Sequence, residues 1–230
     1  MARQGRGILY IVWGERADQV LQRSIDSVKA VHPELPIEVV RVAVAEAGPK
    51  NLRHKAEMME RSPFAETLFL DADTVVLDRL DFGFAKAQRF GVACCICEAP
   101  WARCYKGLAD RGDLIDYNTG VMFFTEAARP LFDLWRRLSQ EIDSSLVYAK
   151  DGKVMVFPFA DQASFAAAAD QAGTPPFVLP LNWNYRPEFQ KSFFGPIKVW
   201  HSYLDVPAEL RQLAAYYRNP DSVVQYARIR

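Results

Sequence analysis

The N-terminal part of the chain alternates between short apolar runs and amphipathic segments. Residues 8–13, 36–42 and 67–70 have the composition of strands buried in a parallel sheet. Residues 15–31 carry apolar side chains at helical spacing, and residues 51–61 lie between an asparagine and a proline, so both segments predict helices. This order predicts an α/β fold with a mostly parallel central sheet flanked by helices. Ligands of such a sheet bind beyond the carboxyl ends of its strands.

The second half of the chain is less regular. Strands are predicted at residues 91–97, 120–124 and 197–200, and helices at residues 126–142, 161–171 and 207–218. The long connections carry Trp101, Tyr105, Trp183, Tyr185 and Phe189. Such rings either pack in the core or line a cleft in which sugar faces stack. With no linker in between, residues 1–218 are expected to form a single domain, followed by a C-terminal tail at residues 219–230.

The charge balance excludes several classes of partner. Lysine plus arginine equals aspartate plus glutamate at 28 each, so no global charge attracts nucleic acid or an anionic membrane. Any anion binding must be local. No apolar run approaches the roughly 18 residues of a membrane span, and no secretory signal is recognisable.

The four cysteines crowd into one stretch at Cys94, Cys95, Cys97 and Cys104, and the chain has no Asn-x-Ser/Thr acceptor site. Both features favour a reducing, cytoplasmic location. Cys94 and Cys97 have a metal-like spacing, but no second pair follows, and the segment has the pattern of a buried strand. We therefore predict buried thiols rather than a zinc site.

Two carboxylates follow directly after the strand predicted at residues 67–70. Residues two apart on an extended chain point the same way and lie roughly 6 to 7 Å apart, so Asp71 and Asp73 can face one cation while Ala72 turns away. Hard oxygen ligands favour Mg²⁺ or Mn²⁺, and such ions keep positions open for substrate phosphates. The alternative is a strand end whose aspartates only begin a turn.

The run Leu-Phe-Leu-Asp-Ala-Asp-Thr at residues 68–74 closely resembles the Asp-x-Asp signature of GT-A glycosyltransferases, in particular glycosyltransferase family 8 and its glycogenin-like form. Three later segments resemble the same family in the same order, namely Asn118-Thr-Gly-Val, Asp161-Gln162 and Leu179-Pro-Leu-Asn-Trp-Asn184. His201 lies where that family places the histidine that completes its metal site. The resemblance covers most of the chain and implies the GT-A fold.

The resemblance also implies residue roles. Asp71, Asp73 and His201 would bind Mn²⁺ or Mg²⁺, with Asp73 as the principal ligand and Asp71 also reaching the nucleotide ribose. Asp161, Gln162 and Asn118 would line the donor sugar and the reaction centre. The implied nucleotide-sugar contacts are Trp13, Gly14, Lys55, Asp71, Asn118, Gly120 and Arg186.

One part of the family pattern is absent. The family's Gly-x-x-Lys-Pro-Trp segment is replaced after His201 by Ser202-Tyr-Leu-Asp-Val-Pro. The lysine that contacts the diphosphate therefore has no obvious equivalent, and Arg186 or Arg211 is the expected substitute. The chain resembles a divergent member of the family.

Each candidate residue also has a structural alternative. His201 beside Trp200 has the context of a packed, hydrogen-bonded side chain. Asp161 has the context of a helix cap, and Lys55 that of a solvated helix lysine. Asn118-Thr-Gly is typical of a turn before a strand. The remaining histidines, His32 and His54, are expected at the surface.

The functional expectation is a metal-dependent transferase that moves a hexose from a UDP-sugar to a saccharide or glycolipid acceptor, with retention of configuration favoured. A nucleotidyltransferase of similar fold is one alternative, but such enzymes usually carry a glycine-rich basic loop where this chain has Val-Trp-Gly-Glu-Arg-Ala at residues 12–17. The other alternative is a non-catalytic protein that binds nucleotide sugars.

Overall fold

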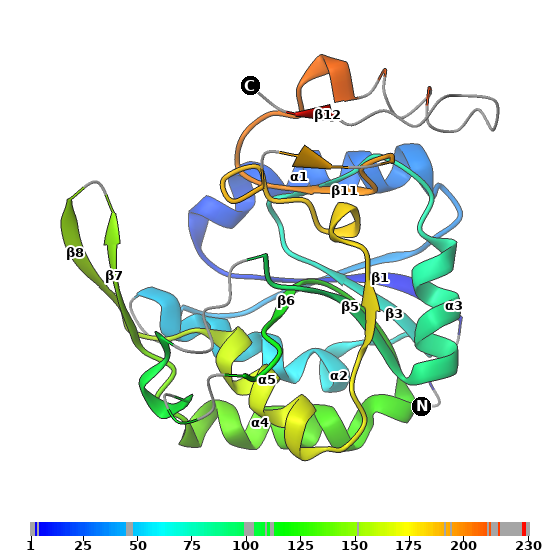
Figure 1. The fold of residues 1–230 in the computed structure, drawn as a ribbon. Helices are drawn as coiled ribbons and strands as arrows, with labels where there is room; N and C mark the ends of the chain where they lie inside the picture. The colour runs from blue at the N-terminus through cyan, green and yellow to red at the C-terminus, as the bar shows by residue number, and fades with distance from the viewer. Residues whose placement is uncertain are drawn as a thin grey trace.

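The predicted N-terminal strands form one half of a six-stranded sheet in the computed structural model (Figure 1). Strand β1 (Arg6–Val12) pairs in parallel with β2 (Ile37–Arg41) and with β3 (Glu66–Leu70). The structure describes residues 3, 5–44, 48–98, 104–108, 110, 113–150, 152–190, 192–193, 195–210, 212, 216 and 227–228.

One antiparallel strand interrupts the parallel order. Strand β6 (Tyr117–Thr125) runs against β3 on one side and against β5 (Val92–Ile96) on the other. Strand β9 (Phe177–Leu179) then continues the sheet in parallel to β5, which gives the order β2-β1-β3-β6-β5-β9. The mostly parallel α/β sheet expected from the sequence is confirmed.

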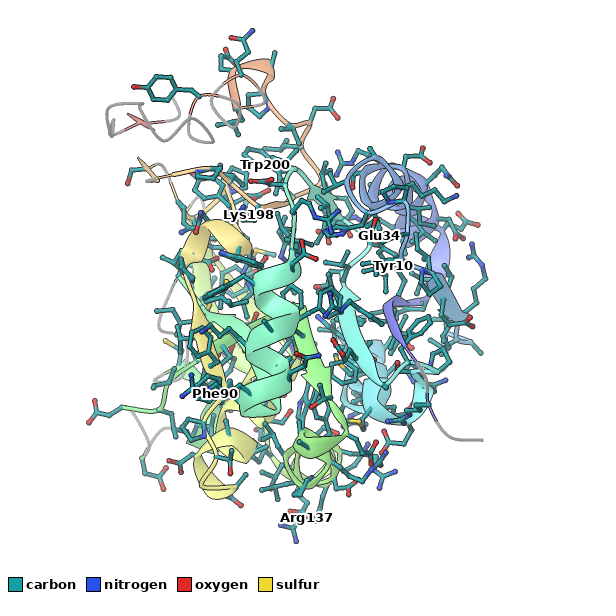
Figure 2. All side chains as sticks on the ribbon, turned by 90° about the vertical axis from the view of Figure 1, so that its right-hand side faces the viewer. Tyr10, Glu34, Phe90, Arg137, Lys198 and Trp200 are labelled. Atoms are coloured by element: carbon teal, nitrogen blue, oxygen red, sulfur yellow. The ribbon has the colours of Figure 1, made fainter. Side chains whose placement is uncertain are left out.

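Helices cover both faces of this sheet. On one face, α1 (Gly14–Val31) and α3 (Asp81–Phe90) pack against alternate strand residues. Tyr10 lies on this face (Figure 2), and Phe123 contacts Phe84 of α3 edge to face. The opposite face is covered by the 3-10 helix η1 (Gly48–Glu57) with α2 (Met58–Arg61), the turn η4 (Glu126–Ala128) with α4 (Arg129–Glu141), and α5 (Asp161–Gln171). Burial on both faces explains why the strands are apolar runs rather than alternating patterns.

Several elements differ from the sequence prediction. Residues 51–61 form a 3-10 helix followed by a single α-helical turn, and the polar side chains of Asn51 and Lys55 are buried there. Helix α3 was not predicted, because Gly83 interrupts its apolar pattern. The glycine is required for packing, since a Cβ at this position would collide with the ring of Phe123.

Several short strands outside the main sheet were also not predicted, whereas β11 (Val199–His201) overlaps the strand predicted at residues 197–200. Strand β4 (Thr74–Val76) pairs with β11, and β7 (Leu146–Lys150) pairs with β8 (Lys153–Phe157). Strand β10 (Ser192–Phe193) pairs with β12 (Ala227–Arg228), inside the segment predicted as a tail. Most of the helix predicted at residues 207–218 lies outside the described residues. No described helix combines the length and hydropathy that a membrane span requires.

The cysteine prediction is largely confirmed. Cys94, Cys95 and Cys97 are buried free thiols, whereas Cys104 is exposed. Burial raises the pKa of Cys94 and of Cys95, so both remain protonated and suit packing rather than metal binding.

The expected surface position of His32 is wrong. His32 is only 1% exposed, and its Nε2 accepts a hydrogen bond of 2.9 Å from the backbone N–H of Leu80, the N-cap of α3. Its Nδ1 faces Glu34 at 3.0 Å. His32 therefore joins the end of α1 to the start of α3, a role that only the tertiary structure reveals. His54, also expected at the surface, is half-buried.

We expect His32→Ala to lower the free energy of unfolding by about 1–3 kcal/mol, because the buried N–H of Leu80 loses its acceptor and the ring leaves a cavity. Thermal melting measures the change. The matched control is Lys29→Ala, an exposed position on the same helix, which should melt with the wild type. Equal melting of His32→Ala and wild type would contradict this role.

Candidate active site

The acidic pair lies at the carboxyl end of β3, where the chain turns into β4. The backbone N–H of Asp71 donates to the carbonyl of Gly120 on β6 at 2.8 Å. The hydroxyl of Thr74 donates to the carbonyl of Asp71 at 2.8 Å. The pair therefore does begin a turn, as the alternative interpretation held, and this turn also fixes both carboxylates.

A histidine from a distant part of the chain completes the cluster. Strand β11 pairs with β4 so that His201 lies opposite Thr74. The Nε2 of His201 is 3.3 Å from Asp73 Oδ1 and 3.6 Å from Asp71 Oδ2. One potential ligand atom from each of Asp71, Asp73 and His201 lies within 4.8 Å of the others.

The other ring nitrogen of His201 is held by Asn184. Its Nδ1 lies 2.8 Å from Asn184 Oδ1, so Nδ1–H donates to that oxygen and Nε2 is turned toward the carboxylates. A histidine ligand of a metal is typically oriented in this way by a second hydrogen bond. The sequence pattern assigned Asn184 no role of its own, and its place at the end of Leu-Asn-Trp-Asn, within a segment that resembles the family, was the available signal.

Gly120 is required by this geometry. A Cβ built on Gly120 would collide with Cε1 of His201 and lie 2.8 Å from Asp71 Oδ2. The side chain of Asn118 supports the same backbone, because its Oδ1 accepts the N–H of Gly120 at 2.9 Å. Both residues are thus placed directly behind the acidic pair and His201.

Lys55 is the central cation of the site. Its ammonium is 3.0 Å from Asp71 Oδ2 and 3.2 Å from Asp161 Oδ2, and the residue is only 3% exposed. Burial alone would lower the pKa of Lys55, but Asp161 and Asp71 raise it above its usual value, so the charge is retained. The alternative of a solvated helix lysine is wrong.

Asp161 begins α5 but does not cap it through its side chain. The N-cap is Ala160, and no side-chain hydrogen bond caps the helix. The carboxylate of Asp161 instead accepts a hydrogen bond from the hydroxyl of Thr119 and pairs with Lys55. The indole of Trp135 donates to the Asp161 carbonyl at 3.2 Å, which fixes the start of the helix.

The two members of the acidic pair differ electrostatically. Burial raises the pKa of Asp71 in spite of Lys55. Burial acts in the same direction on Asp73, but the charge and hydrogen bond of His201 bring the pKa of Asp73 to about 2. An added cation would favour the ionised form of Asp71, so this donor set suits a divalent ion of the hard, oxygen-preferring kind.

A cavity of about 720 Å³ opens beside this cluster. From the predicted site, Asp73, Asp161, Gln162, Arg186 and His201 line it. The remaining lining residues are mainly apolar or aromatic, namely Tyr105, Leu146, Tyr148, Ala149, Phe157, Ala160, Glu188, Phe189, Ser202 and Tyr203. Two of the candidate metal ligands, Asp73 and His201, therefore line the same cavity as several aromatic side chains. Trp101 lies outside the described residues.

Arg186 lines this cavity, but its charge is already paired. Its guanidinium is 3.0 Å from the buried carboxylate of Glu98 and stacks on Phe189. The other expected substitute for the missing lysine, Arg211, lies outside the described residues. Arg16, which sequence reasoning missed, stacks over the ring of Tyr203 at 4.0 Å from its centroid. The available signal was a basic residue two positions after Gly14, shortly beyond the end of β1.

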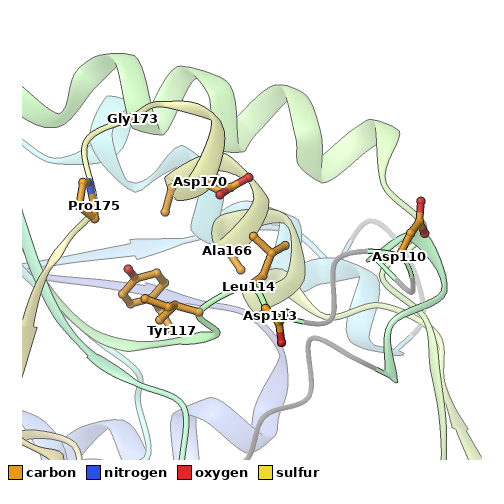
Figure 3. A pocket seen from close by; sticks show the side chains of 10 residues that line it. Asp110, Asp113, Leu114, Tyr117, Ala166, Asp170, Gly173 and Pro175 are labelled. Carbon is orange, nitrogen blue, oxygen red and sulfur yellow. The ribbon is translucent and has the colours of Figure 1, made fainter.

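A second cavity of about 690 Å³ lies beside α5, lined by Asp113, Tyr117, Ala166 and Asp170 among others (Figure 3). None of the predicted site residues borders it.

No family model matches the chain, and no curated protein is similar to it in sequence. Solved structures do match. Mouse xyloside xylosyltransferase 1 is 15% identical with a TM-score of 0.56, over 87% of this chain and 99% of that one. A glycosyltransferase that modifies the major capsid of PBCV-1 is 16% identical with a TM-score of 0.55, over 91% and 98%.

The galactosyltransferase LgtC, solved with donor and acceptor sugar analogs, is 14% identical with a TM-score of 0.54, over 94% of this chain and 98% of that one. At these identities the likeness shows the fold alone. The GT-A fold that the Asp-x-Asp resemblance implied is thereby confirmed.

We expect Gly120→Ala to weaken binding of Mn²⁺ by at least about ten-fold, because the added methyl group displaces His201 by steric collision. Isothermal titration with Mn²⁺ measures the affinity. Gly120 is not among the glycines with a positive φ, so the backbone itself tolerates alanine, and the far-ultraviolet dichroism should stay that of the wild type. Unchanged Mn²⁺ affinity in a folded variant would contradict the assignment.

Proposed function

We propose that this protein is a metal-dependent glycosyltransferase that transfers a hexose from a nucleotide-diphosphate sugar, most readily a UDP-sugar, to a saccharide or glycolipid acceptor. The observation that carries the proposal is the convergence of Asp71, Asp73 and His201 at the carboxyl edge of a GT-A sheet. The three solved structures compared above share this fold and are all glycosyltransferases, and one of them was solved with donor and acceptor sugar analogs.

The donor set fits a Mn²⁺ or Mg²⁺ ion. Asp71 and Asp73 provide hard carboxylate ligands, and His201 provides a borderline imidazole ligand. The Nδ1 of His201 is already hydrogen-bonded to Asn184, so Nε2 is the nitrogen that would bind the ion. The ion, when bound, supplies Lewis-acid stabilisation to the negative charge on the departing diphosphate, which is worth several kcal/mol.

The chain's own residues would arrange the reaction around this site. Lys55 keeps Asp71 and Asp161 close together in spite of their like charges. Asp161 and Gln162 line the cavity beside His201, where the donor sugar would lie. An ionised Asp161 there would stabilise positive charge that develops on the sugar as its bond to the diphosphate breaks. Retention of configuration is the outcome we favour.

We assign the diphosphate contact to Arg16. Tyr203 borders the cavity, and its pKa is raised by burial and by the charge of Asp73, whereas Arg16 acts on it in the opposite sense. Arg16 and Asp73 are therefore both close enough to Tyr203 to change the pKa of its hydroxyl, which places Arg16 near the acidic pair. Among the described residues, no carboxylate forms an ion pair with Arg16, so its guanidinium can turn to a phosphate. Gly14 and Trp13, two and three residues before Arg16, would border the base.

The proposal is tested by thermal shift with UDP-, GDP-, ADP- and CDP-sugars, each with and without Mn²⁺, followed by hydrolysis assays on the sugars that bind. We expect stabilisation by a UDP-sugar that requires Mn²⁺, and Mn²⁺-dependent hydrolysis that Asp73→Asn abolishes because the amide is a poor ligand for a hard cation.

Asp73→Asn is nearly isosteric, so its melting temperature without metal should stay near that of the wild type. Metal-independent nucleotide binding would overturn the proposed site. Binding of UDP without turnover of any donor would favour the non-catalytic alternative, and turnover of a nucleoside triphosphate with a sugar phosphate would favour the nucleotidyltransferase.

Removal of the Arg16 guanidinium should weaken UDP binding in Mn²⁺ by about ten-fold, or ~1.4 kcal/mol, and leave uridine binding unchanged, because only the diphosphate loses a partner. Isothermal titration of Arg16→Ala with both ligands measures this. The control is Arg137→Ala on α4, far from Trp200 and β11 (Figure 2). Equal losses for UDP and uridine would assign Arg16 to the base side instead.

A further inference from the structure

The hairpin formed by β7 and β8 stands away from the body of the protein (Figure 1). Within the part of the chain that the structure describes, its strands pair only with each other, as a two-stranded sheet separate from the main sheet. A hairpin of this kind has little stability of its own in water and normally buries one face against a core. The side chains on each of the two faces therefore indicate what the hairpin contacts.

The outer face of the hairpin is aliphatic and exposed. Val147 lies opposite Val156, and Ala149 lies opposite Val154, so these side chains share one face. Val154 is 76% exposed, Val156 61% and Val147 52%. Contiguous exposed apolar side chains at this density mark a contact surface rather than ordinary protein exterior.

The inner face leads into the cavity described above. Leu146 and Phe157 lie opposite each other, as do Tyr148 and Met155, and three of these four side chains line the same cavity as Asp73 and His201. The inner face of the hairpin thus forms part of the wall of the cavity that contains the candidate metal site. Met155, on this face, is itself 43% exposed.

The tip of the hairpin carries two lysines and one aspartate, in the order Lys150-Asp151-Gly152-Lys153. Lys150 and Lys153 are register partners on the side of Tyr148 and Met155, and Lys153 is exposed. Aliphatic side chains that end in lysines are the composition with which peripheral proteins enter the boundary between acyl chains and headgroups. Protein interfaces instead depend on aromatic and arginine anchors, and the outer face has neither.

We propose that the β7–β8 hairpin is a lipid-docking element that inserts the aliphatic outer face into the surface of a bilayer. Lys153 at the tip then meets anionic headgroups. The inner face connects this surface to the cavity, so an acceptor embedded in lipid would reach the site along the hairpin. Docking itself does not depend on the proposed glycosyltransferase activity.

The test is co-sedimentation of the full chain with vesicles of phosphatidylcholine and with vesicles that also contain phosphatidylglycerol, without nucleotide or metal. We expect the wild type to bind both, and to bind the anionic vesicles more tightly at low salt. Val154→Ser combined with Val156→Ser should reduce binding by about ten-fold or more, because both exposed side chains lose apolar area.

The matched control combines Ile115→Ser with Val178→Ser, which removes two exposed aliphatic side chains elsewhere. It should bind vesicles as the wild type does. Wild-type protein that stays in the supernatant with both vesicles overturns the proposal, as does equal binding by the hairpin variant. A dimer on size exclusion that the hairpin variant converts to a monomer, with no vesicle binding, would assign the face to a second copy instead. UDP binding is measured in a separate experiment. Failure of vesicle binding therefore says nothing against the proposed glycosyltransferase, and failure of UDP binding says nothing against lipid docking.

Discussion

The candidate site depends on a buried lysine that holds two carboxylates together. Asp71 follows β3, Asp161 begins α5, and Lys55 comes from η1, so the ion pairs join three elements at the carboxyl edge of the sheet. Buried carboxylates repel one another and resist ionisation, and the paired ammonium offsets both effects. A buried pair of this kind contributes little net stability, but it fixes where its charges lie, which suits the proposed cation site.

Close packing sets the remaining geometry. His201 reaches the acidic pair only because β11 pairs with β4, and it fits only because Gly120 has no side chain. Asn184 holds the ring so that one nitrogen is left for a ligand. The position of the His201 ring is thus determined by the β4–β11 pairing, by the absence of a side chain at Gly120 and by the amide of Asn184. The two carboxylates alone could not determine it.

The structure brings together several residues that the sequence singled out, and it overturns some of their structural alternatives. Asp71 begins a turn and also faces the cluster, because one backbone conformation serves both purposes. A solvated position was only the structural alternative for Lys55, but it was the expectation for His32, because a polar residue on an amphipathic helix is usually solvated. Both residues are buried. Their burial comes from partners far away in the chain, Asp161 for one and Leu80 for the other, and no local pattern records such partners.

The sequence by itself determined the α/β order of elements, the Asp-x-Asp strand end and the segments that resemble GT-A glycosyltransferases, because these depend on local periodicity and on short motifs. Only the tertiary structure decided which polar groups meet. The β4–β11 pairing, the stacking of Arg16 on Tyr203 and the hairpin at the cavity mouth all join residues distant in sequence. Such contacts follow from the packing of the whole chain, which no single segment encodes.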